Sequence, residues 1–342
     1  MKLVVDKVVK ETEDAVSLYF KNSSFFKKIK YKSGQFLTIK LKINSNEEKR
    51  AYSFSSSPFV DKDLRITIKK VEKGLVSNFV YDNIKAGDKI KVESPTGSFF
   101  FEPDTSKSRN VVLFGAGSGV TPVLSIAKTA LDQEENTKVI FFYANRDIDS
   151  IIFKDEIATL EKQYPQRLTM VHILENNTTK WGNSYEGYLQ QEIVDEVFKQ
   201  NQLDFNKSEY YTCGPQGFMD KVKETLYTHG VDRKKIKMEA FTAPKLKFTG
   251  KNLKSEVTIK QGGKENNLTI PGNKTVLQSC ITNNIKIPFS CRSGMCSTCK
   301  GKCVEGEVTM IDGHTLPEEE VEKGYVLTCV TYPASEKVVI EI

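Results

Sequence analysis

The sequence has few of the residues that several kinds of metal site require. Its three histidines, His172, His229 and His314, lie far apart and form no His-x-x-x-His or Cys-x-His pair. A Rieske centre and an iron site of two histidines and one carboxylate are therefore not expected. No apolar run approaches the roughly 18 residues of a membrane-spanning helix, so no membrane segment is expected either.

The N-terminus and the charge exclude further classes of protein. Residues 1–7 contain too short an apolar stretch for a signal peptide, which predicts a cytoplasmic protein. The formal net charge is +6, but basic and acidic residues alternate and no nucleic-acid-binding motif is present. We therefore expect no nucleic-acid partner and no membrane partner.

Three stretches of different pattern follow one another along the 342 residues. Short apolar runs separated by turn residues predict a small antiparallel β-barrel over residues 1–104. Strands that alternate with helices predict an α/β domain over 105–242, with a parallel sheet between two layers of helices. The cysteine-rich residues 254–342 predict a small α+β domain, and the lysine-rich segment 243–253 predicts a solvated linker.

The expected elements follow from hydrophobic periodicity. In the first block, strands are expected at Lys2–Lys10, Ala15–Phe20, Phe36–Ile43, Leu64–Lys70 and Lys89–Val92, and a helix at Leu75–Asn83. In the second, strands are expected at Val111–Phe114, Val139–Ala144, Leu168–Leu174, Tyr210–Cys213 and Ile236–Phe241, and helices at Thr121–Leu131, Ile152–Gln163, Leu189–Lys199 and Gln216–Thr228. In the third, strands are expected at Ser255–Lys260, Asn267–Ile270 and Lys337–Ile342, and a helix at Val276–Asn283.

Four cysteines of the last block have an informative spacing. Cys291, Cys296 and Cys299 follow one another as C-x4-C-x2-C, and Cys329 comes later. This is the plant-type ferredoxin spacing for a [2Fe–2S] cluster. The small residues around Gly294 allow backbone N–H groups to reach the sulfides. A structural zinc site usually needs paired C-x2-C motifs, and disulfides are unusual in the cytoplasm, so both alternatives are weaker.

Beyond this motif, the last block resembles plant-type ferredoxins, which have a β-grasp fold. The rest of the chain resembles the ferredoxin–NADP reductase superfamily, and the resemblance spans nearly the whole chain. It implies a flavin-binding barrel, a nicotinamide-binding α/β domain and a C-terminal [2Fe–2S] domain.

The run Arg50-Ala51-Tyr52-Ser53 matches the R-x-Y-S flavin motif of this superfamily. The match implies that Arg50 pairs with the flavin pyrophosphate and that Tyr52 packs against the isoalloxazine. It also implies that Ser53 hydrogen-bonds the flavin N5 atom, which accepts hydride. An ordinary barrel strand is the alternative interpretation of so short a motif.

A second match supports the first. Gly74-Leu75-Val76-Ser77 opens an expected helix and corresponds to the G-x-x-S position of the superfamily. The resemblance implies that Gly74, Val76 and Ser77 contact FAD, because free N–H groups at a helix start suit a pyrophosphate. A simple helix cap is the alternative. We expect FAD rather than FMN.

The nicotinamide motifs lie in the second block. The run from Gly115 to Pro122 fits the superfamily pattern G-x-G-x-x-x-T-P through Gly115, Gly117 and Thr121, and not the G-x-G-x-x-G fingerprint. Glycines there let the backbone approach a pyrophosphate. A structural turn is the alternative.

Further site residues are implied by the same resemblance. Cys213-Gly214-Pro215 matches the C-G-P motif that places a cysteine near the nicotinamide C4 atom, so Ser53, Cys213 and Glu239 are the expected catalytic residues. A buried inert thiol is the alternative for Cys213. Phe241 resembles the aromatic residue that shields the flavin, although it could equally be a strand-end core residue.

The choice of nicotinamide nucleotide depends on a mixed signal. Arg146 follows an expected strand and could hold a 2′-phosphate, which favours NADPH over NADH. Asp147 and Asp149 lie close by in the sequence, so the net charge near the ribose 2′ position is ambiguous.

Together the motifs predict an NAD(P)H-dependent oxidoreductase that passes electrons through FAD and a [2Fe–2S] cluster to a partner protein. The domain order resembles reductase components of multicomponent oxygenases, such as the reductase subunits of phenylacetyl-CoA epoxidase complexes. Reductases of hybrid-cluster proteins and of hydroxylases share this layout and remain alternatives for the acceptor. A non-enzymatic electron carrier is the alternative of a different class. A terminal haem or molybdenum enzyme is not expected, because no residues remain for such a domain.

Overall fold

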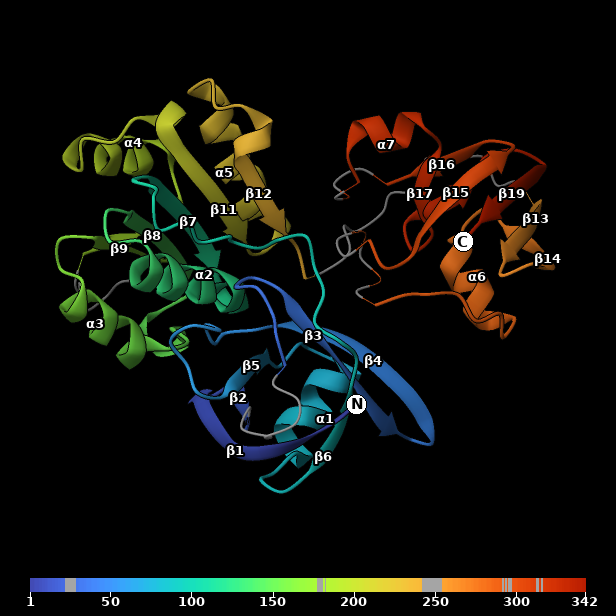
Figure 1. Cartoon of the computed structure of the whole chain (residues 1–342), viewed down its shortest axis with the longest axis horizontal. Coiled ribbons are helices and arrows are strands. Elements are labelled where there is room, and N and C mark those ends of the chain that lie inside the picture. The colour runs from blue at the N-terminus through green and yellow to red at the C-terminus, as the bar shows by residue number, and fades with distance from the viewer. Residues whose placement is uncertain are drawn as a thin grey trace. The chain divides into compact units, whose positions relative to one another are not determined.

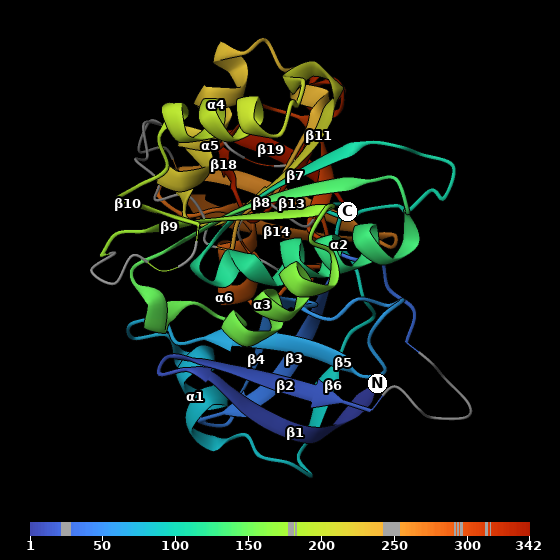
Figure 2. The same ribbon diagram turned by 90° about the vertical axis from the view of Figure 1, so that its left-hand side faces the viewer.

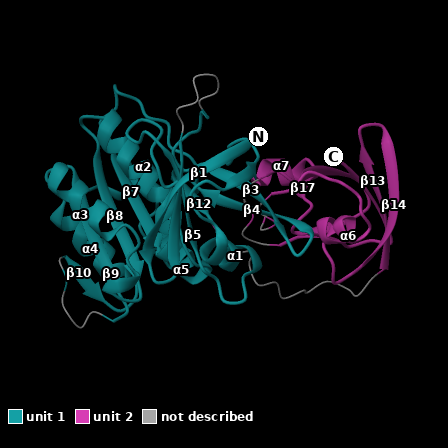
Figure 3. Cartoon of the chain, turned by 90° about the horizontal axis from the view of Figure 1, so that it is seen from below, with its two compact units in different colours: residues 1–239 teal, residues 240–342 magenta. Residues whose placement is uncertain are grey.

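The computed structural model describes residues 1–21, 29–176, 181, 183–241, 254–290, 292, 294, 297–311, 314 and 316–342. They divide into two compact units, residues 1–239 and residues 240–342, which are described separately (Figure 3). The predicted linker at 243–253 lies outside the described residues. Within the described part, no helix is long and apolar enough to cross a membrane.

The first part of the first unit is an antiparallel barrel (Figure 1). Its strands are, in sheet order, β4 (Asn46–Ser53), β3 (Phe36–Ile43), β6 (Lys89–Val92), β1 (Lys2–Thr12), β2 (Ala15–Phe20) and β5 (Leu64–Lys69). An isolated bridge between Phe54 and Ile66 joins the end of β4 to β5 and closes the sheet. Helix α1 (Leu75–Asn83) adds Val76 and Val80 to the barrel core. The expected barrel is confirmed.

The rest of the first unit is a parallel sheet. Its strands are, in sheet order, β10 (Ser184–Glu186), β9 (Leu168–Leu174), β8 (Lys138–Asn145), β7 (Asn110–Ala116), β11 (Ser208–Cys213) and β12 (Ile236–Glu239). The chain builds outward from β7 in one direction and then returns to place β11 on its other side. Such a reversal leaves a crevice at the carboxyl ends of the two central strands, where ligands of open α/β sheets bind.

Helices cover both faces of this sheet, as Figure 2 shows. One face packs against α2 (Val120–Gln133) and α3 (Lys154–Gln163), and the other against α4 (Gln191–Gln200) and α5 (Gln216–Thr228). Successive residues of β7 alternate between the two cores. Strands buried on both faces are therefore apolar throughout, which is why the sequence predicts them well. The described residues of this domain also form short 3-10 turns: η1 (Gly117–Gly119), η2 (Ile148–Ser150), η3 (Phe205–Lys207) and η4 (Arg233–Lys235).

The second unit is a small α+β domain, as expected. Its mixed sheet has the order β14 (Lys264–Pro271), β13 (Lys254–Gln261), β19 (Lys337–Glu341), β15 (Lys300–Glu305) and β17 (Tyr325–Leu327). A second ladder pairs β16 (Val308–Met310) with β18 (Thr331–Pro333). Helix α6 (Val276–Thr282) packs on the sheet, and α7 (Glu318–Glu322) is a single exposed turn.

Several element boundaries differ from the expectation. β12 ends at Glu239 and does not reach Phe241, and α3 begins at Lys154 because Phe153 has a left-handed backbone with φ of 64°. The strands β4, β10 and β15–β18 and the turn α7 were not among the expected elements.

Candidate functional site

A cavity of about 570 Å³ lies at the carboxyl ends of the parallel strands. Its walls come from the ends of β7 and β8, the loop before α4 and the start of α5. The lining residues are Lys69, Ala116, Gly117, Ala144, Asn145, Arg146, Glu175, Gly187, Tyr188, Leu189, Gln190, Pro215, Gly217, Phe218 and Lys221. The cavity therefore borders the crevice that the reversal of strand order predicts for a ligand.

Glycines allow the backbone to form one wall of this cavity. Gly117 has a φ of 52°, a left-handed conformation that glycine adopts without strain. A Cβ at Gly119 would collide with the carbonyl oxygen of Cys213, so only glycine lets the start of α2 lie this close to β11. Thr121 donates a hydrogen bond from Oγ1 to the carbonyl of Ser118 at 3.0 Å and fixes this turn. The arrangement leaves the first turn of α2 open toward the cavity, as an anion-binding loop requires.

The cavity has the polar groups that a dinucleotide needs. Lys69, Arg146 and Lys221 line it, with Glu175 as the one carboxylate among its described lining residues. Asn145 is 6% exposed, and its amide makes no well-aligned hydrogen bond within the described structure, with the Tyr143 hydroxyl as its polar neighbour. Because buried amides are almost always paired, this side chain fits a site in which a ligand supplies the partner.

The three expected catalytic residues meet at one place. The Ser53 hydroxyl, at the end of β4, donates to Oε2 of Glu239 at 2.9 Å, which links the barrel to the last parallel strand. Cys213 pairs in register with Glu239 on one side and with Gly115 on the other. All three expected residues are buried, and Cys213 is 0% exposed. Residues far apart in sequence thus converge where the two domains meet.

The environment of Cys213 keeps its thiol protonated. Burial raises the pKa of the thiol well above its ordinary value, and the charge of Glu239 raises it further. A thiol of this kind is a poor nucleophile. Burial and charge therefore disfavour a nucleophilic thiolate at Cys213.

The expected flavin residues lie along β4 and at the start of α1. Arg50 is partly exposed, and its contacts with Glu48 and with the Lys49 carbonyl both use Nη1, so the rest of the guanidinium can face a phosphate. Tyr52 packs against the barrel core, where burial raises the pKa of its hydroxyl. Ala51 lies between them on the same strand.

The start of α1 has the form of a phosphate cradle. Gly74 is the N-cap residue of α1. Because it has no side chain, it provides no capping group to accept a hydrogen bond from the N–H groups of the first turn. A Cβ at Gly74 would collide with Oγ of Ser77, so glycine allows Ser77 and Val71 to pack closely against the start of the helix. The Ser77 hydroxyl accepts from the Val71 amide at 3.2 Å, and Val76 is buried beside it. These residues fit the pyrophosphate of FAD.

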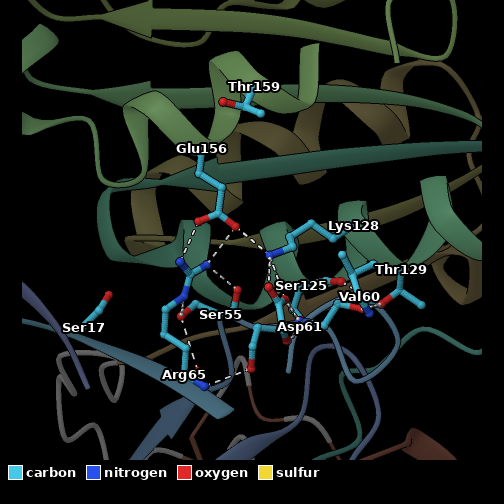
Figure 4. A network of polar contacts seen from close by, with 12 residues as sticks. Ser17, Ser55, Val60, Asp61, Arg65, Ser125, Lys128, Thr129, Glu156 and Thr159 are labelled. Atoms are coloured by element: carbon cyan, nitrogen blue, oxygen red, sulfur yellow. Dashed lines mark hydrogen bonds and ion pairs between the residues drawn. The ribbon is translucent and has the colours of Figure 1, made fainter. Parts of the chain in front are cut away.

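A buried ion network joins the barrel to the α/β domain (Figure 4). Arg65 of β5 forms two contacts with Glu156 of α3, at 2.6 and 3.2 Å. Lys128 of α2 lies 2.6 Å from the same carboxylate and 2.7 Å from Asp61. Arg65 and Lys128 are each 5% exposed, and Arg65 also donates to the Ser55 carbonyl at 2.8 Å. The network therefore holds β5, which ends at Lys69, against α2, which follows the glycine loop.

In the second unit, the structure describes two of the four expected cluster ligands. Cys299 and Cys329 are 3% and 7% exposed, and the amide of Gly294 donates to Sγ of Cys329 at 3.2 Å. Cys291 and Cys296 lie outside the described residues. A backbone N–H directed at a thiolate sulfur is the contact that iron–sulfur sites use, so the described part fits a cluster.

The structure adds site residues that the motifs did not reveal. Lys69 reaches the cavity from the barrel, and Asn145, Lys221 and Phe218 line it from the α/β domain. None belongs to a recognised motif, and Lys69 is far in sequence from the glycine loop that its Nζ approaches. The remaining expected residues, Gly214 and Pro215, precede α5, whereas Phe241 is 43% exposed and belongs to the second unit.

Three family models match the chain. They are the oxidoreductase FAD-binding domain at residues 2–101, the oxidoreductase NAD-binding domain at 113–224 and the 2Fe-2S iron-sulfur cluster binding domain at 259–334. The expected cofactors, FAD, NAD(P)H and a [2Fe–2S] cluster, are thereby confirmed.

Relatives of similar length match over nearly the whole chain. The ferredoxin reductase component of 3-ketosteroid-9-alpha-monooxygenase from Rhodococcus rhodochrous is 34% identical over 99% of this chain and 96% of its own length. A subunit of 1,2-phenylacetyl-CoA epoxidase from Escherichia coli is 29% identical over the same shares. The structure of phthalate dioxygenase reductase aligns with a TM-score of 0.65 over 100% of this chain and 98% of its own, at 22% identity, and shares the fold.

Proposed function

The chain belongs to the family of FAD- and [2Fe–2S]-containing ferredoxin reductases of multicomponent oxygenases, and from this premise we propose how its residues serve that activity. When bound, FAD accepts an electron pair as hydride and releases single electrons, which matches a two-electron nicotinamide to a one-electron cluster. The observation that carries the proposal is the meeting of Ser53, Cys213 and Glu239 at the end of β11, two residues before Pro215, which lines the dinucleotide cavity.

We propose that these three residues position the cofactors and that the Cys213 thiol stays protonated. The Ser53 hydroxyl lies at the end of the flavin strand, where Glu239 holds its orientation through the 2.9 Å hydrogen bond. Cys213 ends β11 between Gly115 and Glu239, and its buried neutral thiol supports the backbone of the loop at Gly214 and Pro215, against which we propose that the nicotinamide ring packs. All three side chains are buried, which keeps the Ser53–Glu239 hydrogen bond away from competing water.

We propose NADPH as the preferred donor. Arg146 lines the cavity directly after β8, the position at which a basic residue holds a 2′-phosphate, and Lys221 adds a second cation. Glu175 is the opposing carboxylate among the described lining residues.

We propose an oxygenase component as the acceptor, with a phenylacetyl-CoA epoxidase as the first candidate to test. The support is the full-length likeness to a component of that complex from Escherichia coli. The comparable likeness to a 3-ketosteroid monooxygenase reductase makes a steroid hydroxylase the second candidate. Coupled product formation with each purified oxygenase and its substrate distinguishes them.

Anaerobic stopped-flow mixing with NADPH, and separately NADH, tests the reductase activity. Flavin bleaching followed by loss of cluster absorbance is the expected result, with NADPH the faster donor. No flavin response to either nucleotide would contradict the function itself.

Two cysteine variants provide a matched control. Cys299→Ser should abolish cluster absorbance while flavin bleaching persists. Cys303→Ser removes a half-buried thiol outside the ligand spacing and should leave both signals intact. Loss of the cluster in Cys303→Ser would overturn the ligand assignment.

A further inference from the structure

Two cations that line the cavity, Lys69 of the barrel and Arg146 of the α/β domain, share a counter-ion from the barrel. Asp14, in the turn between β1 and β2, directs Oδ2 at both Lys69 Nζ, at 3.5 Å, and Arg146 Nη2, at 3.4 Å. Its other oxygen, Oδ1, accepts a hydrogen bond from Thr12 at 2.8 Å, which fixes the carboxylate in this position.

Each cation has a place in the dinucleotide cavity. Lys69 Nζ lies 3.9 Å from where a Cβ of Gly117 would be, so it stands over the loop that receives a pyrophosphate. Arg146 is 62% exposed at the cavity mouth, and Asp14 is 30% exposed. Asp14 itself is not a lining residue, but it neutralises two of the groups that would bind phosphate.

We propose that Asp14 is a specificity-determining residue that weakens recognition of a 2′-phosphate by Arg146. The proposal rests on the proposed function, because it takes this cavity to be the nicotinamide nucleotide site. A 2′-phosphate can pair with Arg146 only in competition with the Asp14 carboxylate, which lies 3.4 Å from Nη2 of the same guanidinium. The flavin domain thereby limits the preference for NADPH over NADH.

The geometry separates two effects of the same carboxylate. Competition for Lys69 acts on the pyrophosphate, which NADPH and NADH share, and so changes both affinities alike. Competition for Arg146 acts only on the 2′-phosphate. The proposal concerns the second effect, which appears as a change in the ratio of two affinities.

Calorimetric titration of the FAD- and cluster-loaded protein with 2′,5′-ADP and with 5′-AMP measures that ratio without electron transfer. The Asp14→Asn variant keeps an acceptor for Thr12 and removes the charge. It should increase the preference for 2′,5′-ADP over 5′-AMP by about three- to tenfold at low salt, the size expected for a nearby charge in a solvated site. In an Arg146→Gln background the same substitution should leave the ratio within about twofold.

A neighbouring carboxylate gives the matched control. Glu13→Gln removes one negative charge next to Asp14 in the chain, from an exposed side chain, and should leave the ratio unchanged. An unchanged or lowered ratio in Asp14→Asn, or an equal rise in the Arg146→Gln background, would overturn the proposal. Absence of binding by both nucleotides would overturn it together with the nucleotide site, whereas binding without a change in ratio would leave the reductase function standing.

Discussion

Two ion clusters join the barrel to the α/β domain, and their cations differ in access to water. Arg65, Glu156, Lys128 and Asp61 form the buried cluster, whose two cations are each 5% exposed, whereas the side chains of Glu156 and Asp61 are 26% and 29% exposed. Asp14, Lys69 and Arg146 form the cavity cluster, whose side chains are 30%, 22% and 62% exposed and whose separations are 3.4 to 3.5 Å.

Because their cations differ in exposure, the two ion clusters suit different roles. A charge pair removed from water cannot lose one member cheaply, because the other is then left buried without a partner. A solvated pair contributes little to stability and can exchange partners. The buried cluster therefore suits a fixed joint between domains, and the cavity cluster suits a place where a ligand phosphate replaces a carboxylate.

The largest expected effect is on stability and concerns Glu156. Glu156→Ala leaves the buried Arg65 without its carboxylate partner, although Lys128 keeps Asp61, and should lower the free energy of unfolding by about 3–5 kcal/mol. Urea unfolding, followed for the transition of the unit that contains Glu156, measures this loss of stability. Asp155→Asn, an exposed site on the same helix, is the control and should change stability by about 0.5 kcal/mol or less. A comparably small change in Glu156→Ala would remove the distinction between the clusters.

The second prediction concerns how the stability contributed by the Glu156 carboxylate depends on pH. Burial raises the pKa of Glu156, but Arg65 and Lys128 more than offset it, so the pKa in the folded protein is lowered from 4.5. The contribution of the carboxylate is therefore fully present above that value and is lost as the pH falls through the lower folded-state pKa. The stability gap between the wild type and Glu156→Gln should be constant from pH 7 to 5 and should narrow below about pH 4. A gap that widens on acidification would show that the carboxylate is not held ionised.

The sequence predicts well what depends on local pattern. The central strands β7, β8, β9 and β11 of the parallel sheet are predicted because each is an apolar run, whereas the polar edge strand β10 is missed. The flavin and nicotinamide motifs are predicted because each is short and contiguous, and the cysteines because their spacing is characteristic. β4 escaped because Asn46–Arg50 is polar and has no alternation of apolar residues. It forms because Asn44 and Ser45 adopt left-handed φ values of 48° and 68° and turn the chain back onto β3.

The sequence does not predict the ion clusters, for a different reason. Arg65 and Glu156 are 91 positions apart, and Asp14 and Arg146 are 132 apart. Charged residues at such separations are normally solvated, and no local spacing marks the few that meet. The same holds for Asn145, whose burial without a well-aligned hydrogen bond becomes visible only when the cavity around it is formed.

The third prediction concerns the stability of the cavity cluster. Asp14→Asn should change the free energy of unfolding by about 0.5 kcal/mol or less, because solvated pairs near 3.5 Å contribute little. The same urea titration used for Glu156→Ala measures it. A loss of 2 kcal/mol or more would make Asp14 part of the joint, and its effect on nucleotide binding would then reflect movement of the domains.

The smallest expected effect, and the one that separates the clusters most directly, is their response to salt. The screening length falls from about 10 Å at 0.1 M to about 3 Å at 1 M, and screening acts on charges that water reaches. The change in nucleotide preference caused by Asp14→Asn should therefore shrink to below about twofold in 1 M NaCl. The destabilisation caused by Glu156→Ala should persist, since its partners are enclosed. Both are measured as differences from the wild type at the same salt concentration, which cancels general salt effects on folding. Equal sensitivity of the two differences would mean that exposure does not decide what each cluster does, and Asp14 would then have to act through the position of Arg146 rather than through its charge.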